Sequence, residues 1–324
     1  MKKVIAFDLS SGDKGTAEAL KAAVNFCNIN KEWKIVAFSV DKITSKLPEN
    51  LEIIMCSEII GQNDSALEFK RKKDSTLFKA IELVASGEAD GLLSPAASGP
   101  LVTATYLTFR TIANMKPAYA AVASSAKGEL RVLLDAGANM SANSEMLNKY
   151  AFMGSEFAKI IGLSKNPIVK MLNVGSEDSK GTSLQKEAFE LMKNNKSINF
   201  QGNIEANKII SSSDIHVIVT DAFSGNIVVK AYEGAFRIVG NIIKSSVKES
   251  FIDKAGFLLA KKFRKQMKIA LNDGKGGGGV VLGLNNLVVK AHGSSNEAAF
   301  TSSLNVAKQA IELDLINVIK EKME

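Results

Sequence analysis

Short apolar runs alternate with longer segments in which apolar residues recur every three or four positions, almost from end to end of the chain. The short runs predict strands, and the recurring spacing predicts amphipathic helices. The expected strands cover residues 4–7, 34–40, 51–55, 91–93, 131–135, 168–174, 215–221 and 287–291. The expected helices cover residues 16–26, 76–86, 144–162, 183–193 and 297–313.

The expected strands are apolar throughout, which is typical of a parallel sheet buried on both faces. Their alternation with helices predicts a doubly wound α/β fold with a mostly parallel sheet. No internal repeat, low-complexity linker or shift in composition divides the sequence. We therefore expect residues 1–324 to form a single two-lobed catalytic unit.

Residues 225–271 depart from this alternation, because their apolar positions keep a helical spacing throughout. We expect a protruding helical pair here, with a break at Gly256. One apolar stripe is expected on the second helix, made of Ile252, Ala255, Leu259, Phe263, Met267 and Ala270. Such a stripe could pack on the protein's own core or on a neighbouring subunit, or face a partner or membrane.

The positive charge of the chain is concentrated in the same segment. The net charge is +7, and residues 236–272 hold nine basic residues against Glu249 and Asp253, a surplus of seven. The basic residues are Arg237, Lys244, Lys248, Lys254, Lys261, Lys262, Arg264, Lys265 and Lys268. This basic amphipathic segment predicts docking to an acidic protein or an anionic membrane. Nucleic acid is not expected as a partner, because the segment lacks a platform of several stacking aromatics.

Other features place the chain among globular proteins of the cytoplasm. Hydrophobic residues make up 46% and charged residues 23% of the sequence, which fits a folded core. Asp8 interrupts the first apolar run, so no signal peptide is expected. Residues 91–109 lack charge but contain two prolines, which argues against a membrane span. Cys27 and Cys56 lack metal-ligand spacing and read as reduced core residues.

Six turns rich in glycine, serine and other polar residues follow expected strands. In doubly wound folds, ligands bind at the carboxyl ends of strands, and a turn that enters a helix offers free N–H groups to an anion. The six turns include residues 8–13, 94–100, 135–139, 173–183, 221–226 and 291–295. The candidate binding residues are Asp8, Ser11, Gly12, Ser98, Gly99, Gly137, Asn139, Gly181, Asp221, Ser224, Gly225, Gly293, Ser294 and Ser295.

Two of these turns carry a cationic or titratable residue beside a helix start. Thr182 with Gln185, and Ser294 with Glu297, match capping boxes, which places Lys180 and His292 just ahead of two helices. Each could serve a bound anion, or be a solvated lysine and a locally hydrogen-bonded histidine. His216, in a strand, is expected to be structural.

Several familiar motifs are missing from the sequence. It contains no G-x-S-x-G elbow, no phosphate-binding GxxxxGK[ST] motif and no His/Cys cluster for zinc. Covalent catalysis by serine or cysteine is therefore not expected, nor is a metal or cofactor. The glycines at 276–279 allow either a close approach of the backbone to a ligand or a mobile connection, and the sequence leaves this open.

Taken in order, several blocks closely resemble the phosphate acyltransferases of bacterial phospholipid synthesis, the PlsX family. They are LDAGAN (134–139), NPIVKMLNVGSEDSKG (166–181), KEAFELMK (186–193), INFQGNIEA (198–206), TDAFSGNIVVKAYEG (220–234) and VVKAHGSS (288–295). The sequence departs from the usual family motifs in DLSSGD (8–13), in SPAASGP (94–100), at Met140 and Ser141, and in GGGVVLG (277–283).

The resemblance implies a fold like that of isopropylmalate dehydrogenase and phosphotransacetylase, and a homodimer with its active site near the subunit interface. It implies transfer of a long-chain acyl group from acyl carrier protein to orthophosphate, without a cofactor. Catalytic roles fall on Lys180, Asn226 and His292, where His292 donates to the thioester oxygen or accepts a proton from phosphate. Docking to the carrier protein or to an anionic membrane falls on Lys261, Lys262, Arg264, Lys265 and Lys268. Contact with the next acyltransferase is also expected, without assigned residues.

Two alternatives share part of this pattern. A phosphotransacetylase-like enzyme acting on acyl-CoA would use the same chemistry, and only its substrate preference would differ. A non-catalytic scaffold at the membrane would keep the fold while its altered first loops had lost activity. A decarboxylating dehydrogenase of the same fold is less well supported, because such enzymes gather several arginines and this chain has only five.

Overall fold

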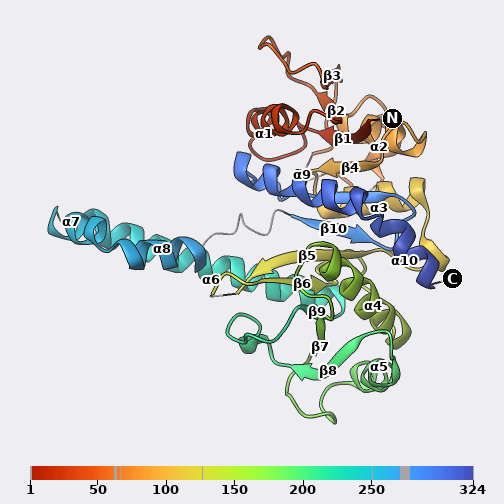
Figure 1. Ribbon diagram of the computed structural model, residues 1–324, viewed down its shortest axis with the longest axis vertical. Coiled ribbons are helices and arrows are strands. Elements are labelled where there is room, and N and C mark those ends of the chain that lie inside the picture. Colours follow the sequence, from red (N-terminus) through yellow and green to blue (C-terminus); the bar gives the residue numbers. More distant parts are fainter. Residues whose placement is uncertain are drawn as a thin grey trace.

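The computed structural model describes residues 2–61, 64–65, 67–125, 127–249, 251–270 and 278–323. Its strands form one sheet in the order β3-β2-β1-β4-β11-β10-β5-β6-β9-β7-β8 (Figure 1). The strands are β1 (Lys3–Asp8), β2 (Trp33–Ser39), β3 (Leu51–Met55), β4 (Gly91–Ser94), β5 (Ala118–Ser124), β6 (Leu130–Leu134), β7 (Ile168–Leu172), β8 (Asn199–Ile204), β9 (Val217–Val219), β10 (Gly279–Leu282) and β11 (Leu287–Lys290).

Helices cover both faces of this sheet. The α-helices are α1 (Thr16–Ile29), α2 (Thr76–Ala85), α3 (Ser98–Phe109), α4 (Ser144–Ile160), α5 (Ser183–Asn194), α6 (Ala222–Glu249), α7 (Phe251–Leu259), α8 (Lys261–Ala270), α9 (Glu297–Glu312) and α10 (Leu315–Met323). Apolar residues of α1, α4, α5, α9 and α10 share one core with the sheet. Helices α2 and α3 form a second core, and α6 packs on a third, smaller one.

The sheet is mostly parallel, as the sequence predicted, and it consists of two parallel groups of strands. Strands β3, β2, β1, β4 and β11 pair in parallel, and so do β6, β9, β7 and β8. Antiparallel pairing through β10 and β5 joins the two groups. The fold is therefore doubly wound and mostly parallel, with a change of strand direction between its two halves.

Strands β5, β8 and β10 lie where the sequence pattern predicted none. The β5 segment reads AYAAVAS and β8 reads NFQGNI, so neither has the β-branched run that marks a strand. Their neighbours supply the pairing that their own composition does not favour. The glycines of the 276–279 run that the structure describes have a packing role, since a side chain at Gly278 would collide with the Lys290 carbonyl oxygen. Gly276 and Gly277 lie outside the described residues.

Helix α6 starts against the sheet and leads out of the body of the molecule to α7 and α8, which extend away from it (Figure 1), as expected for the protruding segment. The predicted break at Gly256 is wrong, because Gly256 lies inside α7 and its carbonyl accepts the Ala260 N–H at 3.0 Å. The break falls at Ala260 instead, and the predicted stripe is therefore divided between α7 and α8. The rings of Phe257 and Phe263 meet across that break, with centroids 6.3 Å apart.

Two smaller predictions concern the cysteines and a possible membrane span. Cys27 and Cys56 are buried and unpaired, and burial raises the pKa of each thiol to about 11. Neither thiol is therefore ionised at neutral pH. Within the described part of the chain, every helix is too short or too polar to cross a bilayer.

Candidate active site

The turn after β1 is held by a buried carboxylate. Asp8 is fully buried, and its Oδ1 accepts the N–H groups of Ser10 and Ser11, each at 3.2 Å. Its Oδ2 accepts the hydroxyl of Ser94, the last residue of β4, at 2.7 Å. Asp8 therefore uses its oxygens to tie two neighbouring turns together, which makes it a positioning residue for this part of the site.

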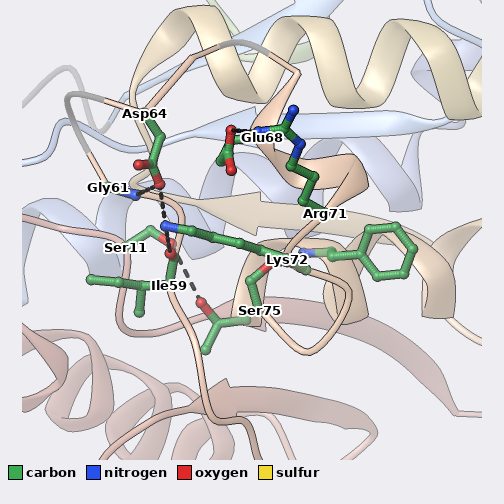
Figure 2. A network of polar contacts seen from close by, with 10 residues as sticks. Ser11, Ile59, Gly61, Asp64, Glu68, Arg71, Lys72 and Ser75 are labelled. Atoms are coloured by element: carbon green, nitrogen blue, oxygen red, sulfur yellow. Dashed lines mark hydrogen bonds and ion pairs between the residues drawn. The ribbon is translucent and has the colours of Figure 1, made fainter.

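The loop between β3 and α2 supports the same turn. Lys72 Nζ donates to Asp64 Oδ2 at 2.6 Å, and the N–H of Gly61 donates to the same oxygen at 2.7 Å (Figure 2). The hydrogen bond from Lys72 lowers the pKa of the Asp64 carboxyl. In the same region, the hydroxyls of Ser11 and Thr76 lie 3.4 Å apart. Ser11 thus faces the start of α2 and contributes to packing of the turn.

The turn after β11 closes against the turn after β1. The Asp13 N–H donates to the Gly293 carbonyl at 2.8 Å. A side chain at Gly12 would lie 3.1 Å from the same carbonyl oxygen and 3.3 Å from Pro95. Space for a side chain at position 12 is tight because three loops meet there, those after β1, β4 and β11.

A second group of turns gathers around Asp135, at the end of β6. Its carboxylate accepts four backbone N–H groups, those of Tyr119, Gly137, Ala138 and Asn139, at 2.8–3.0 Å. Burial nevertheless raises the pKa of this carboxyl. The result is a rigid turn in which the Asn139 side chain donates to the Ser141 carbonyl at 2.8 Å.

The first turn of α6 packs closely on that turn. A side chain at Gly225 would collide with the Asp135 carbonyl oxygen, and one at Gly137 would collide with Asn226 Nδ2. Asp221 Oδ1 accepts the Ser224 N–H at 2.9 Å and so satisfies one free donor of the helix start. The two glycines therefore allow the contact between turn and helix that sets the position of Asn226.

A cavity of about 580 Å³ lies between α6 and the sheet, where the two halves of the fold meet. Of the predicted site residues, Ser98, Asn226, His292 and Gly293 contribute to its lining. Asn226 and Glu233 are seven residues apart on α6, which corresponds to about 10 Å along the helix axis. Because Glu233 approaches His292, the Asn226 and His292 side chains reach different parts of the cavity.

His292 is held in a defined orientation at the cavity. Its Nδ1 accepts the Ser294 N–H at 3.2 Å and lies 2.8 Å from the Ser294 hydroxyl. In the neutral ring, an accepting Nδ1 assigns the proton to Nε2, which lies 3.8 Å from Glu233 Oε1. His292 therefore presents an N–H donor, and 64% of its side chain is exposed.

The capping box predicted at Ser294 and Glu297 is wrong. Helix α9 begins at Glu297 with Asn296 as its N-cap, whose side chain accepts the Ala299 N–H. Ser294 instead engages His292, while the Ser295 N–H donates to the His292 carbonyl at 3.0 Å. The turn thus serves to orient the histidine, because the closer asparagine already caps the helix.

Lys290 is a cavity residue that the sequence reading missed. It ends β11, is 7% exposed, and its Nζ donates to the carbonyls of Ala96 at 3.1 Å and Ala291 at 3.2 Å. Burial lowers the pKa of this amine to about 8. The available signal was a lysine inside an otherwise apolar buried strand, VVKA, two positions before His292.

Lys180 lies outside the cavity lining. It belongs to the loop between β7 and α5, is half exposed, and its Nζ is 4.0 Å from Glu177 Oε1. The following Gly181 has a φ of +94° and precedes the capping box of Thr182 and Gln185, which is present as predicted. Five strand spacings of about 4.8 Å separate β7 from β11, or roughly 24 Å. One chain therefore does not bring Lys180 to His292.

The remaining predicted residues have local or surface positions. Gly99 lies in the first turn of α3 and has open space at its Cβ position. His216 accepts the Ile168 N–H at 3.0 Å, and burial lowers its pKa, as expected of a structural histidine. Lys261, Lys262 and Lys265 are exposed on α8. Arg264 is partly buried, and the side chain of Lys268 lies outside the described residues.

The polar part of the cavity can bind an anion next to a hydrogen-bond donor. Lys290 supplies a buried cation, His292 an N–H group, and Ser98 a hydroxyl, all on the same cavity. Such preorganised donors stabilise an oxyanion that forms during acyl transfer. Among the described residues no group of three His, Cys, Asp or Glu side chains is placed to hold a metal.

The chain is similar to known proteins along its whole length. Residues 3–318 match the family model described as fatty acid synthesis protein. Proteins named phosphate acyltransferase from Staphylococcus epidermidis and Staphylococcus aureus are 37% identical over 319 residues, 98% of this chain and 97–98% of theirs. Among solved structures, a phosphotransacetylase from Streptococcus pyogenes matches with a TM-score of 0.61 and 18% identity over 96% of this chain and 94% of its own. A branched-chain phosphotransacylase from Enterococcus faecalis matches with a TM-score of 0.56 and 17% identity over 95% and 99%.

These likenesses define the class of protein as an acyltransferase enzyme, built on the fold that phosphotransacetylases share. Identity at the level of a third of the residues, over nearly all of both chains, narrows this class further. The chain belongs to the phosphate acyltransferase family, PlsX, which its sequence motifs resemble.

Proposed function

We propose that this protein transfers a long-chain acyl group from the thioester of acyl carrier protein to orthophosphate, giving acyl phosphate for phospholipid synthesis. The observation that carries the proposal is the cavity in which buried Lys290 and the N–H donor of His292 lie together. Relatives named phosphate acyltransferase supply the reaction type to which this pair of groups is suited.

The chemistry requires little from the protein beyond placement. Phosphate is already a nucleophile and a thioester is already activated, so binding the two in contact lowers the barrier. A phosphate oxygen attacks the carbonyl carbon, the C–S bond breaks, and the carrier thiolate takes up the proton that phosphate loses. His292 Nε2–H donates to the carbonyl oxygen as it becomes an oxyanion. Lys290 holds the phosphate, next to the turns of Gly12 and Gly293.

Asn226 and Gly225 would act from the start of α6. The helix start carries a partial positive charge and free N–H groups, and Asn226 lines the cavity at that end. We place them beside the bound substrate, where Asn226 orients it. Lys180, as the second cation of the motif set, would complete the site from a second copy of the chain in a homodimer.

The protruding helices would form the docking surface. Lys261, Lys262 and Lys265 are exposed on α8, next to the exposed Leu258, Leu259 and Phe263. A surface of this kind attracts an acidic carrier protein, or the anionic inner face of a membrane. We therefore propose a cytoplasmic enzyme that contacts the membrane peripherally and passes acyl phosphate to the next acyltransferase.

The first test is direct detection of the product. Purified protein incubated with long-chain acyl carrier protein and phosphate should yield acyl phosphate by mass spectrometry. His292→Ala should lower kcat by roughly 10²–10³, the usual effect of removing one oxyanion donor. His216→Asn is the matched control, since an amide oxygen can still accept the Ile168 N–H, and its kcat should stay near that of the wild type.

The same assay separates the competing functions. Faster turnover with acyl-CoA than with acyl carrier protein would identify a phosphotransacetylase-like enzyme. Carrier protein that binds without any product would identify a non-catalytic scaffold. A decrease below threefold in His292→Ala, with normal folding, would remove His292 from the proposed mechanism.

A further inference from the structure

One row of residues crosses the sheet along the floor of the cavity. Strand register aligns Lys290 with Gly279, Gly279 with Ala121, Ala121 with Leu133, and Leu133 with Ile218. Residues aligned in this way share one face of a sheet. The row therefore begins at the buried amine of Lys290 and becomes entirely apolar from Gly279 onward.

Helix α6 and the segment before β9 cover this row. Val229 and Phe236 of α6 line the cavity together with Ile209 and Ile210. On α6, Asn226, Val229, Glu233 and Phe236 recur at spacings of three and four, so they lie along one side of the helix. Glu233 lies beside His292 at the phosphate end, whereas Asn226 lies about two helical turns away, and the apolar Val229 and Phe236 cover the groove.

The groove exists because Ala121 of the floor is small. Gly279 beside it leaves no space for a side chain of its own, since a Cβ there would collide with the Ala120 carbonyl oxygen and with the Tyr119 ring. Ala121 presents only a methyl group and is partly exposed, whereas Leu133 and Ile218 beyond it are buried. Ala121 therefore leaves room beside the Tyr119 ring, between the polar end of the cavity and its apolar interior.

We propose that the acyl chain of the substrate lies along this row, from Lys290 across Ala121 and Leu133 to Ile218, and that Ala121 determines whether long chains are accepted. The proposal rests on the proposed function, which places the reacting carbonyl at His292 and Lys290. Apolar walls with a few polar groups at one end are the usual design of a site for an amphipathic ligand.

The length of the row fits a long chain. Three strand spacings of about 4.8 Å, from β10 to β9, give roughly 14 Å. Since C–C bonds are about 1.5 Å long, an extended alkyl chain advances about 1.3 Å per carbon, so the row accommodates roughly a dozen carbons. The cavity volume of about 580 Å³ is within the usual range for small-molecule sites.

A buried cation marks the boundary of the groove. Arg131 pairs with Ala123 in the neighbouring row, lines the cavity and is 1% exposed. Its Nη2 donates to the Ser212 carbonyl, while Nε and Nη1 have no hydrogen-bond partner among the described residues. Alkyl carbon cannot satisfy these N–H groups, so the chain follows the row of Leu133 rather than that of Arg131.

The test enlarges the small side chain of Ala121 in the floor of the groove. Ala121→Leu should lower kcat/KM for a 16-carbon donor at least about tenfold relative to a 4-carbon donor, since each excluded methylene loses roughly fourfold in binding. Ala121→Ser, which is nearly the same size, is the matched control and should keep the wild-type ratio. Thermal unfolding of both variants establishes that they are folded.

A binding measurement separates this proposal from the proposed function. Wild type should bind cis-parinaric acid, a fluorescent 18-carbon chain, and Ala121→Leu should bind it at least about tenfold more weakly. If that difference holds but no donor yields acyl phosphate, the chain site stands and the proposed function fails. If wild type makes acyl phosphate while Ala121→Leu reduces long and short donors equally, or binds the probe as tightly, the chain site is wrong.

Discussion

At the scale of one residue, the buried amine of Lys290 is suited to binding phosphate but lowers the stability of the fold. The amine is taken out of water, and its two carbonyl partners are neutral. Burial therefore disfavours the charged form and lowers its pKa to about 8. A cation held in this way is poorly solvated and available to a phosphate, which is the property that the proposed reaction needs.

Replacing Lys290 should separate those two effects. The folded-state pKa lies below the unfolded value, so the protonated lysine destabilises the fold at neutral pH, and wild type should gain stability as pH rises from about 8 to about 10.5. Lys290→Met should be more stable at pH 7 by as much as roughly 3 kcal/mol, at about 1.4 kcal/mol per pKa unit, and should lose that pH dependence. Urea unfolding at several pH values measures both.

Lys290→Met should also need more phosphate to reach half-maximal rate, and Lys290→Arg should restore part of the phosphate affinity. A Met variant with unchanged phosphate dependence would contradict the role of Lys290 in phosphate binding.

At the scale of elements, sequence periodicity was sufficient where each element supplies its own apolar pattern. Strands such as β2 and β9 and helices such as α4 are readable alone. Strand β5 is not, because its alanines are stabilised as a strand by pairing with β6 and with β10, and β10 lies far along the chain. For the same reason the row through Ala121 could not be predicted, since register belongs to the sheet as a whole.

The positions of single candidate residues also depend on the fold as well as on the local sequence. His292 was predictable from its isolation in a polar turn, and the structure places it on the cavity. Lys180 has an equally suggestive turn, yet the order of strands places β7 far from β11. Gly256 matched the usual signature of a helix break, but a single glycine in a solvent-exposed helix costs only about 1 kcal/mol, so the helix continues through it.

The element α8 makes a prediction of its own. Lys262→Glu with Lys265→Glu should raise KM for acyl carrier protein roughly tenfold or more at low ionic strength, because steering between opposite charges is lost. Short acyl-CoA donors should be turned over as before. Lys196→Glu with Lys320→Glu, two exposed lysines elsewhere on the surface, is the control with the same change in net charge. Equal effects of the α8 changes on both donors would rule out docking through this helix.

At the scale of the whole molecule, two parallel half-sheets meet through antiparallel strands, and the cavity lies over that junction. One half contributes Lys290 and His292, and the other contributes Asn226 and the covering helix α6. Lys180 belongs to the second half and lies in the loop after β7. A single centre that uses both Lys180 and His292 therefore requires two copies of the chain, in agreement with the homodimer that we propose.

Complementation between two inactive variants tests this arrangement. If each site takes His292 from one copy and Lys180 from the other, a dimer of one His292→Ala chain and one Lys180→Ala chain has one intact site and one doubly altered site. Random pairing makes half of the dimers mixed, so co-expressed variants should recover about a quarter of wild-type activity. Each variant purified alone supplies the baseline, and light scattering gives the oligomeric state. Recovery no greater than the mean of the two baselines, in a sample shown to contain mixed dimers, would mean that each chain carries its own complete site and that Lys180 acts elsewhere.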